Sequence, residues 1–130
     1  MIPASDLRIK NYVLNHHRQL CFVNKISDDD VVEVTKAGTH ETYFCMSEAL
    51  SPIPLGGWLD NLGFEQNKFH KVLRAQRKDG TRLSFKYVND GIVINGAGFL
   101  LFVKVDYVHQ FQNLFFAIIG EEVKVTVSNA

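Results

Sequence analysis

The sequence predicts an α+β fold, in which a small SH3-like barrel unit is followed by an antiparallel β-meander with one packed C-terminal helix. Three observations predict it. The first half contains short apolar runs that are separated by clusters of turn-forming residues. The second half contains longer runs in which apolar and polar residues alternate between tight turns. One amphipathic stretch without charged residues, at 107–120, then predicts a single helix.

The first half predicts four short strands. The connections between them are rich in turn formers, and strands so short and closely spaced favour a strongly bent, SH3-like barrel. With 130 residues the chain is long enough for one domain, or for two very small ones that share a core. We expect a barrel-like unit at 1–50 and the meander with its helix at 51–130. The predicted strands are 11–14, 20–26, 31–35 and 42–46.

The segment between the two halves predicts an extended crossing and one weak helix. Pro52 and Pro54 fix the backbone and remove two hydrogen-bond donors, which favours an extended linker. Gly56–Leu62 can then form a short helix, although its two leading glycines weaken it. Gly63 is suited to the left-handed conformation that ends such a helix.

The first hairpin of the second half has a register that can be predicted. Leu83 and Phe85 alternate with basic and polar residues, so the odd positions face inward. A three-residue loop at Lys78–Gly80 sets Leu83 opposite Ala75 and Phe85 opposite Leu73. A two-residue turn would mix the two faces instead, so we predict the longer loop.

The rest of the meander follows from a second turn. A two-residue turn at Asp90-Gly91 is expected to pair Tyr87 with Ile94. After the helix, alternating valines at 123, 125 and 127 predict a final strand. The four predicted strands of the meander are 69–77, 81–88, 92–95 and 99–105.

The helix at 107–120 has an apolar stripe and an uncharged opposite side. Asp106 is the expected N-cap, and Gly120 the expected end. An ordinary surface helix carries charges on its polar side. Their absence predicts that His109, Gln110 and Asn113 are covered, either by the N-terminal unit, which we favour, or by a second copy of the chain. The expected stripe is Tyr107, Phe111, Leu114, Phe115 and Ile118, with Val108 and Ile119 at its margin.

The charges of the chain are balanced overall but unevenly distributed. Residues 1–65 contain five Lys or Arg and nine Asp or Glu, a net charge of −4, whereas residues 66–130 contain nine and five, a net charge of +4. The basic residues concentrate in the hairpin at 68–86, which could contact phosphates. A solvated sheet face is the favoured interpretation, because no aromatic residues are interleaved on the outward face of the hairpin. The candidate contacts are Lys71, Arg74, Arg77, Lys78, Arg82 and Lys86.

No motif in the sequence predicts catalysis, a cofactor or a metal. His16 and His17 are adjacent, so on a strand they would point to opposite faces and could not share an ion. Asp106 and His109 could form an acid–base pair, but an N-cap with a polar first turn is the simpler interpretation. Asp28–Asp30 lacks the spacing of a calcium loop. The glycines of Gly91–Gly98 are explained by hairpin turns.

The chain resembles a family of short uncharacterised proteins from Bacteroidetes genomes and their phages and mobile elements. The resemblance is carried by DLRIKNYV near the start, by IPL and WLDNLGFE in the middle, and by YVHQFQNLFFAIIGEEV at the end. It implies a bacterial or phage origin and supports the predicted fold, but it implies no activity and no catalytic residues. The chain departs from the family at Lys10, where glycine is usual, and at Gly56-Gly57, where polar residues that begin a helix are usual.

These observations predict a non-enzymatic binding or adaptor protein, phage-related or from a mobile element. A protein partner or self-association is possible, and the alternative function is a nucleic-acid-binding accessory protein that uses the basic hairpin. No apolar run is long enough to span a bilayer, and the first residues lack the order of a signal peptide. Cys21 and Cys45 are expected to be buried thiols. We therefore expect a cytoplasmic protein.

Overall fold

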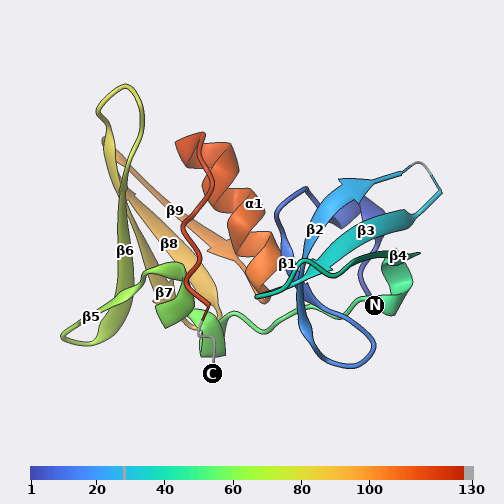
Figure 1. Cartoon of the computed structure of the whole chain (residues 1–130). Helices are drawn as coiled ribbons and strands as arrows, with labels where there is room; N and C mark the ends of the chain where they lie inside the picture. The colour runs from blue at the N-terminus through green and yellow to red at the C-terminus, as the bar shows by residue number, and fades with distance from the viewer. Residues whose placement is uncertain (28, 128–130) are drawn as a thin grey trace. The chain divides into compact units, whose positions relative to one another are not determined.

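The computed structural model describes residues 1–27 and 29–127, and of Phe99 only the backbone. The fold is α+β, with two antiparallel sheets and one helix near the C-terminus (Figure 1). The first sheet consists of β1 (Tyr12–Leu14), β2 (Leu20–Ile26), β3 (Val31–Lys36) and β4 (Thr42–Met46), and the second of β5 (Glu65–Asn67), β6 (His70–Gln76), β7 (Arg82–Val88), β8 (Gly91–Gly96) and β9 (Phe99–Lys104). The helix is α1 (Val108–Ile119), and the short 3-10 turns are η1 (Ala4–Asp6), η2 (Ser47–Ala49), η3 (Gly56–Trp58) and η4 (Asp60–Leu62).

The chain divides into two compact units. The first contains residues 1–53 together with 107–113 and 127, and the second contains 54–106 and 114–126. The first half of α1 therefore belongs to the first unit and the second half to the second unit. We had expected a simple division after residue 50, because sequence periodicity gives no reason to divide one helix between two units.

The first sheet has the predicted strands but does not form a closed barrel. Its strands pair in the order β1-β2-β3-β4, so β1 and β4 are the two edges. After β4 the chain makes the turn η2 and returns to β1, where Leu14 and Ser51 exchange both backbone hydrogen bonds. This single bridge is too short to close the sheet, so the described residues form an open four-stranded sheet and no closed barrel.

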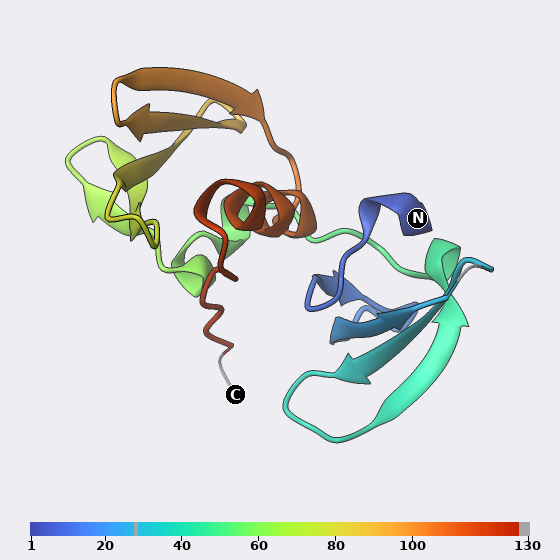
Figure 2. The same ribbon diagram turned by 90° about the horizontal axis from the view of Figure 1, so that it is seen from above.

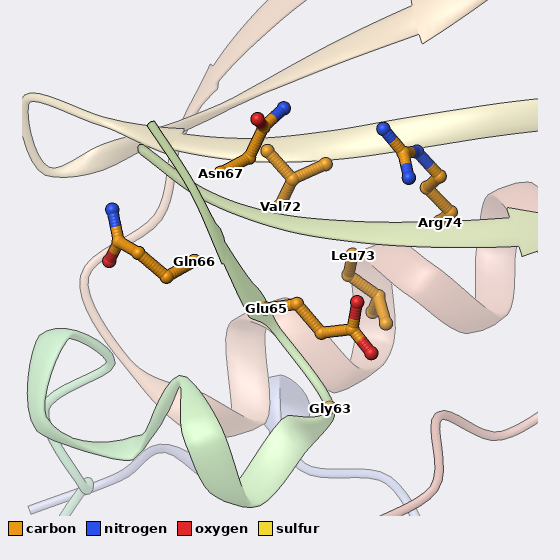
Figure 3. Close-up of a pocket in the computed structure, with 7 residues that line it drawn as sticks. All are labelled: Gly63, Glu65, Gln66, Asn67, Val72, Leu73 and Arg74. Carbon is orange, nitrogen blue, oxygen red and sulfur yellow. The ribbon is translucent and has the colours of Figure 1, made fainter. Parts of the chain in front are cut away.

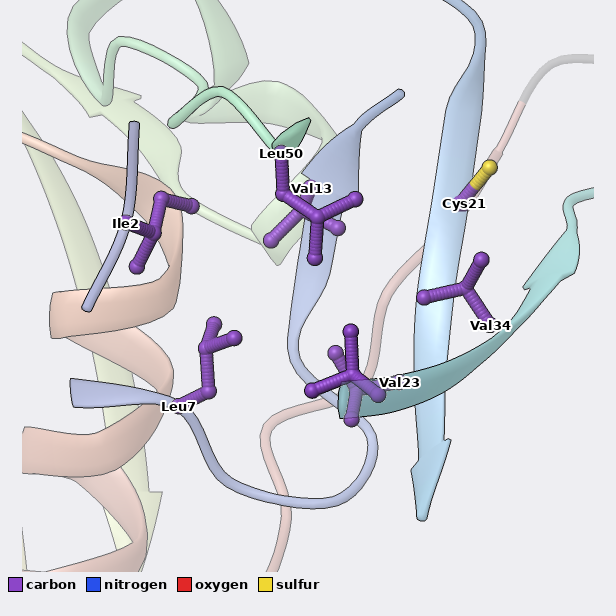
Figure 4. Close-up of a cluster of buried hydrophobic side chains, with 8 residues drawn as sticks. Ile2, Leu7, Val13, Cys21, Val23, Val34 and Leu50 are labelled. Atoms are coloured by element: carbon purple, nitrogen blue, oxygen red, sulfur yellow. The ribbon is translucent and has the colours of Figure 1, made fainter. Parts of the chain in front are cut away.

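The core of the first unit is aliphatic and lies on one side of this sheet (Figure 4). Alternate residues of β2 and β3 face it, as the period of two in a strand requires, until a register shift after Val23 leaves Lys25 exposed and turns Ile26 toward the core. The thiol of Cys21 lies among these side chains and is fully buried. The buried set is Ile2, Leu7, Val13, Cys21, Val23, Val32, Val34 and Leu50.

A tight turn before β1 forms at Lys10, which is not a glycine. Lys10 adopts a positive φ of 79°, and its N–H donates to the carbonyl of Val23 at 2.7 Å. The next N–H, of Asn11, donates to the carbonyl of Arg8 at 3.0 Å. The hydrogen bonds on either side thus hold Lys10 in a conformation that non-glycine residues rarely adopt.

The first hairpin of the second sheet has the predicted register. Leu73 pairs with Phe85 and Ala75 with Leu83, and the backbones of Arg77 and Thr81 close the three-residue loop. Gly80 in that loop has a φ of +92°, as expected. A further strand, β5, precedes this hairpin and was not predicted, because its residues are polar and exposed.

The second hairpin turns one residue earlier than predicted. Tyr87 pairs with Ile92 and not with Ile94, and the turn is formed by Asn89 and Asp90, both with positive φ. This is the pattern of a type I′ turn. Gly91 instead begins β8, where a side-chain Cβ would come within 2.4 Å of the ring of Phe102. The glycine therefore serves close packing rather than the turn.

The helix begins one residue later than predicted, with Tyr107 in the N-cap position. Gln110 accepts a hydrogen bond from the N–H of Tyr107 at 3.1 Å, one half of a capping box. Asp106, the predicted N-cap, instead lies one residue before the N-cap position. The helix ends at Gly120, which has a φ of +86° and donates its N–H to the carbonyl of Phe116.

The buried stripe of α1 is rotated from the predicted one. Phe111 and Phe115 are buried as expected, but Leu114 and Ile118 are only half-buried. In the second unit, the second half of α1 lies along one face of the sheet (Figure 2), and the rings of Phe115 and Phe85 are 5.2 Å apart. The buried residues of the helix are Val108, His109, Phe111, Gln112, Phe115 and Ile119.

The segment after the helix does not form the predicted strand. Residues 121–127 belong to no strand of the described chain, although Val123 is buried. Instead, Thr126 donates its N–H to the carbonyl of Asn61, and the Asn61 amide donates to the carbonyl of Thr126, both at 2.8 Å. These two hydrogen bonds hold the segment against the turn η4, in place of the strand pairing that a final strand would need. The turns η3 and η4 stand where one short helix was predicted, and Gly63 ends them with a φ of +90°.

The two buried rings of α1 are expected to carry much of the stability. Phe111→Ala and Phe115→Ala should each lower the free energy of unfolding by about 3–5 kcal/mol, because each leaves a cavity. Phe116 is 40% exposed, so Phe116→Ala is the control and should cost clearly less. Urea unfolding of the three variants measures this, and equal losses would contradict it.

Gly96 is expected to tolerate no side chain. It has a φ of +139°, and an added Cβ would lie 2.5 Å from the carbonyl oxygen of Arg82. Gly96→Ala should therefore cost about 2–4 kcal/mol through strain and overlap. Gly98 also has a positive φ but has open space around it, so Gly98→Ala should cost about 1 kcal/mol. Thermal unfolding compares the two, and a Gly96→Ala variant as stable as Gly98→Ala would refute the steric argument.

Candidate functional site

The side of the second sheet that faces away from its buried residues is here called the outer face. Leu83, Phe85, Ile92 and Ile94 point to the buried side. The residues between them in sequence point to the outer face, because side chains alternate along a strand. The outer face of β6 and β7 carries Val72, Arg74, Gln76, Arg82, Ser84 and Lys86, which pair across the two strands as Val72 with Lys86, Arg74 with Ser84 and Gln76 with Arg82.

Two further strands extend the outer face with apolar side chains. Val93 of β8 lies between Lys86 and Phe102, so the three form one row across the sheet. In the next row Asn95 lies between Ser84 and Leu100. Phe102 is 55% exposed and Leu100 is 71% exposed. An aromatic ring therefore does stand in line with the basic residues, contrary to the interpretation of the hairpin alone.

The structure brings together only half of the basic residues that the sequence singled out. Arg74, Arg82 and Lys86 share the outer face, and Lys104 of β9, which the sequence analysis did not include, continues it. Among the described residues, none of the four forms an ion pair. They are therefore four positive charges on one face without an ion-pair partner in the described part of the chain.

The other three candidates lie elsewhere. Lys71 points to the opposite side of the sheet, where its ammonium Nζ lies 2.6 Å from Oδ1 of Asp60. Arg77 and Lys78 lie in the loop after β6. The Arg77 Nε is 3.9 Å from the Asp79 carboxylate, whose pKa is lowered chiefly by hydrogen bonds from Thr81. Arg77 and Lys78 are not on the outer face because the three-residue loop ends the strand before them. Lys71 is within β6, but its odd position turns it to the opposite side.

A hollow of about 530 Å³ lies on the outer face where β6, β7 and β8 meet. Ser84 and Gly96 are small residues between larger neighbours, and this leaves the space open. Its polar groups are two guanidinium groups, two amides and one hydroxyl. The lining residues are Arg74, Ala75, Gln76, Arg82, Leu83, Ser84, Asn95 and Gly96.

A smaller hollow, of about 270 Å³, lies between β5 and β6 (Figure 3). Asn67, Val72 and Arg74 point to one side of β6, and Leu73 points to the other. Glu65 lies opposite Val72 in the register of β5 and β6, and among the described residues it forms no ion pair with Arg74. Arg74 thus contributes to both hollows.

The two thiols are unsuited to nucleophilic chemistry. Cys21 and Cys45 are free. Burial raises the pKa of both thiols, and in Cys21 this outweighs the hydrogen-bonding contact with the Tyr43 hydroxyl, 3.7 Å away, and the charge of Lys36. Because the thiolate is the reactive form, a raised pKa favours inert thiols.

The histidines and acids do not form a metal centre in residues 1–27 and 29–127, where no group of three potential ligands meets. His16 and His17 lie in a turn rather than on a strand, and their rings are 3.9 Å apart, so they do not point to opposite faces as predicted. The acidic run at 28–30 begins at a residue outside the described part of the chain.

The uncharged side of α1 is covered only in part. In the first unit, Asn113 is half-buried and its amide oxygen accepts from Arg8 Nε at 3.1 Å and from Asn11 Nδ2 at 2.9 Å. Its Nδ2 donates to the carbonyl of Asp6 at 3.0 Å. This agrees with the favoured cover, the N-terminal segment. Gln110, however, is exposed, so its predicted burial is wrong. Its amide serves the N-cap instead.

Gln112 is the amide that the sequence analysis missed. It is 2% exposed, accepts the N–H of Tyr12 at 2.8 Å and donates to the carbonyl of Lys10 at 3.1 Å. It thereby satisfies backbone groups on either side of the turn before β1. Its place four residues after Val108, on the buried stripe, was the available signal.

His109 is the one buried titratable group of the first half of α1. It is 3% exposed, its ring stacks on Tyr107 at 6.0 Å, and its Nδ1 has no hydrogen-bond partner among the described residues. Burial lowers the pKa of this imidazole, and this outweighs the opposing effect of the Asp6 carboxylate. The neutral ring is therefore the form that the fold favours.

No protein-family model matches the chain, and no match is found among curated proteins or solved structures. Within the described residues, α1 and the shorter turns are not long and apolar enough to cross a membrane.

Buried His109 predicts that the protein loses stability in mild acid. Its pKa is lower in the folded chain, so the unfolded chain binds the proton first. Stability is therefore complete above the unfolded value of about 6.5 and falls as the pH decreases toward the folded value. Thermal unfolding between about pH 7.5 and pH 5 measures this. His109→Gln should flatten the dependence and His40→Gln, an exposed control, should not; the same slope in both variants would contradict the assignment.

Proposed function

We propose that this chain is a non-enzymatic binding protein that holds single-stranded nucleic acid on the outer face of its five-stranded sheet. The observation that carries the proposal is the row formed by Lys86, Val93 and Phe102, in which a cation and an exposed ring share one face. Proteins that bind single strands combine positive charges for the backbone with aromatic rings for the bases.

The charges supply the attraction for phosphate. Arg74, Arg82, Lys86 and Lys104 form no ion pairs within the described residues, so they can contact phosphates without first losing a carboxylate. Four contacts of this kind give a binding free energy that depends strongly on salt, because each releases counterions. The overall neutrality of the chain does not oppose this, since the charges concentrate on one sheet.

The apolar side chains favour single strands over duplex. Phe102 and Leu100 are two residues apart on β9 and both are more than half exposed. Large exposed apolar groups on a sheet face indicate a binding surface. Bases in a duplex are already stacked on one another, whereas the bases of a single strand are free to stack on Phe102.

A second candidate function is protein binding by the first unit. Phe44 and Met46 on the edge strand β4 are 66% and 43% exposed. An edge strand with apolar side chains can accept an extended peptide as a further strand. The turn η2 and the Leu14–Ser51 bridge also support an SH3-like arrangement of this unit, open rather than closed.

The origin and location of the protein are proposed from its motifs and its thiols. The motifs quoted above are the support for a phage or mobile-element origin in Bacteroidetes. A cytoplasmic location is in keeping with the free thiols of Cys21 and Cys45.

Fluorescence anisotropy with labelled single-stranded DNA, single-stranded RNA and duplex tests the proposal. Four phosphate contacts to a single strand should weaken binding about 50-fold between ~50 and ~200 mM salt. Replacing Arg74, Arg82 and Lys86 with alanine should remove most of that salt dependence. Replacing Arg18, Lys25 and Lys124, which are exposed residues elsewhere, removes the same charge and should change affinity little.

A second comparison isolates base stacking. Phe102→Ala should cost about 1–3 kcal/mol of binding free energy without changing the salt dependence. Phe44→Ala removes a ring of the first unit that is 66% exposed, against 55% for Phe102, and serves as the control. No binding of any strand at ~50 mM salt, or equal losses in both sets of variants, would contradict the proposal.

A further inference from the structure

The hollow on the outer face has one end suited to phosphate. Arg74 lies opposite Ser84, and Arg82 is two residues from Ser84 on the same strand. Such diagonal neighbours are about 7–8 Å apart, so two long side chains can converge on one group. Guanidinium groups bind phosphate oxygens in pairs, and neither of these has an ion-pair partner among the described residues.

The other end of the hollow is suited to a base. Asn95 lies across β7 from Arg74, with Ser84 between them. Within the described chain, the side-chain amide of Asn95 makes no hydrogen bond. The amide of Gln76 lines the same hollow and likewise makes no hydrogen bond there. Leu100 lies beside Asn95 and offers an apolar surface against which a ring can rest.

The floor of the hollow is formed by backbone. Gly96 approaches the carbonyl oxygen of Arg82 so closely that a Cβ would lie 2.5 Å from it. Ser84 lines the hollow with a small side chain, whose hydroxyl donates to the backbone carbonyl of Asn95 at 3.4 Å. The volume, about 530 Å³, is within the range of pockets that hold a single small ligand.

We propose that this hollow is a nucleotide subsite that selects adenine, with Arg74 and Arg82 on the phosphate and Asn95 on the base. The inference rests on the proposed function and deepens it. Asn and Gln amides match adenine because they donate to N7 and accept from the N6 amino group at once. Lys86 and Phe102, in the neighbouring row, contact backbone and ring faces and do not distinguish bases.

The experiment compares two labelled oligonucleotides of about ten nucleotides, a length within the range of one binding site. One is thymidine throughout and the other carries a single central adenosine. The wild-type chain should bind the second at least about fivefold more tightly, the lower limit expected for one bidentate amide–adenine pair. Asn95→Thr should reduce the ratio to about one, while the affinity for the thymidine strand stays unchanged.

The matched control is Asn67→Thr, the same substitution on β5, outside the hollow, which should keep the preference for adenosine. Threonine is favourable in strands, so both variants should fold; Gln76→Ala gives a second test of the hollow if Asn95→Thr does not. Failure to bind either strand overturns both proposals. Equal binding of both strands by the wild type overturns the subsite alone, as does a preference that persists when Asn95 is replaced.

Discussion

The outer face of the five-stranded sheet depends on the register of its three longer hairpins. A slip by one residue would turn every side chain of a strand to the other face. The loop closed by Arg77 and Thr81 and the turn at Asn89-Asp90 fix β6, β7 and β8 relative to one another. The turn before Phe99 then sets β9 so that Phe102 falls in line with Lys86. The cations and the exposed ring share a face because each of the three hairpin connections sets a register that keeps even-numbered residues of β6, β7 and β9 on the same side.

The first unit depends on a second constraint, the amides of α1. Gln112 and Asn113 satisfy polar groups of the segment from Asp6 to Tyr12, which carries the chain from η1 into β1. A charged residue would serve neither position as well, because a partly buried backbone needs both a donor and an acceptor. The lack of charge on this helix is therefore explained within the first unit, without a second copy of the chain.

The polar groups of the outer face are of the kinds that recognise nucleic acid. The outer face carries guanidinium, ammonium, amide and hydroxyl groups, which recognise phosphate and base edges. The thiols of buried Cys21 and half-buried Cys45 have raised pKa values, and the buried imidazole of His109 has a lowered pKa. These shifts follow from desolvation inside the first unit and are not coupled to a group on the outer face.

The sequence by itself determined the strands of the first sheet, the loop at Lys78–Gly80 and the end of α1 at Gly120, because period and turn chemistry are local properties. It misjudged the turn before β8, since Gly91 was needed for packing against Phe102, a contact far along the chain. Only the tertiary structure decided that Leu100 and Phe102 join the basic residues and that Gln112 is buried. Such neighbours are set by strand order and by the rotation of a helix, and no short window of sequence contains them.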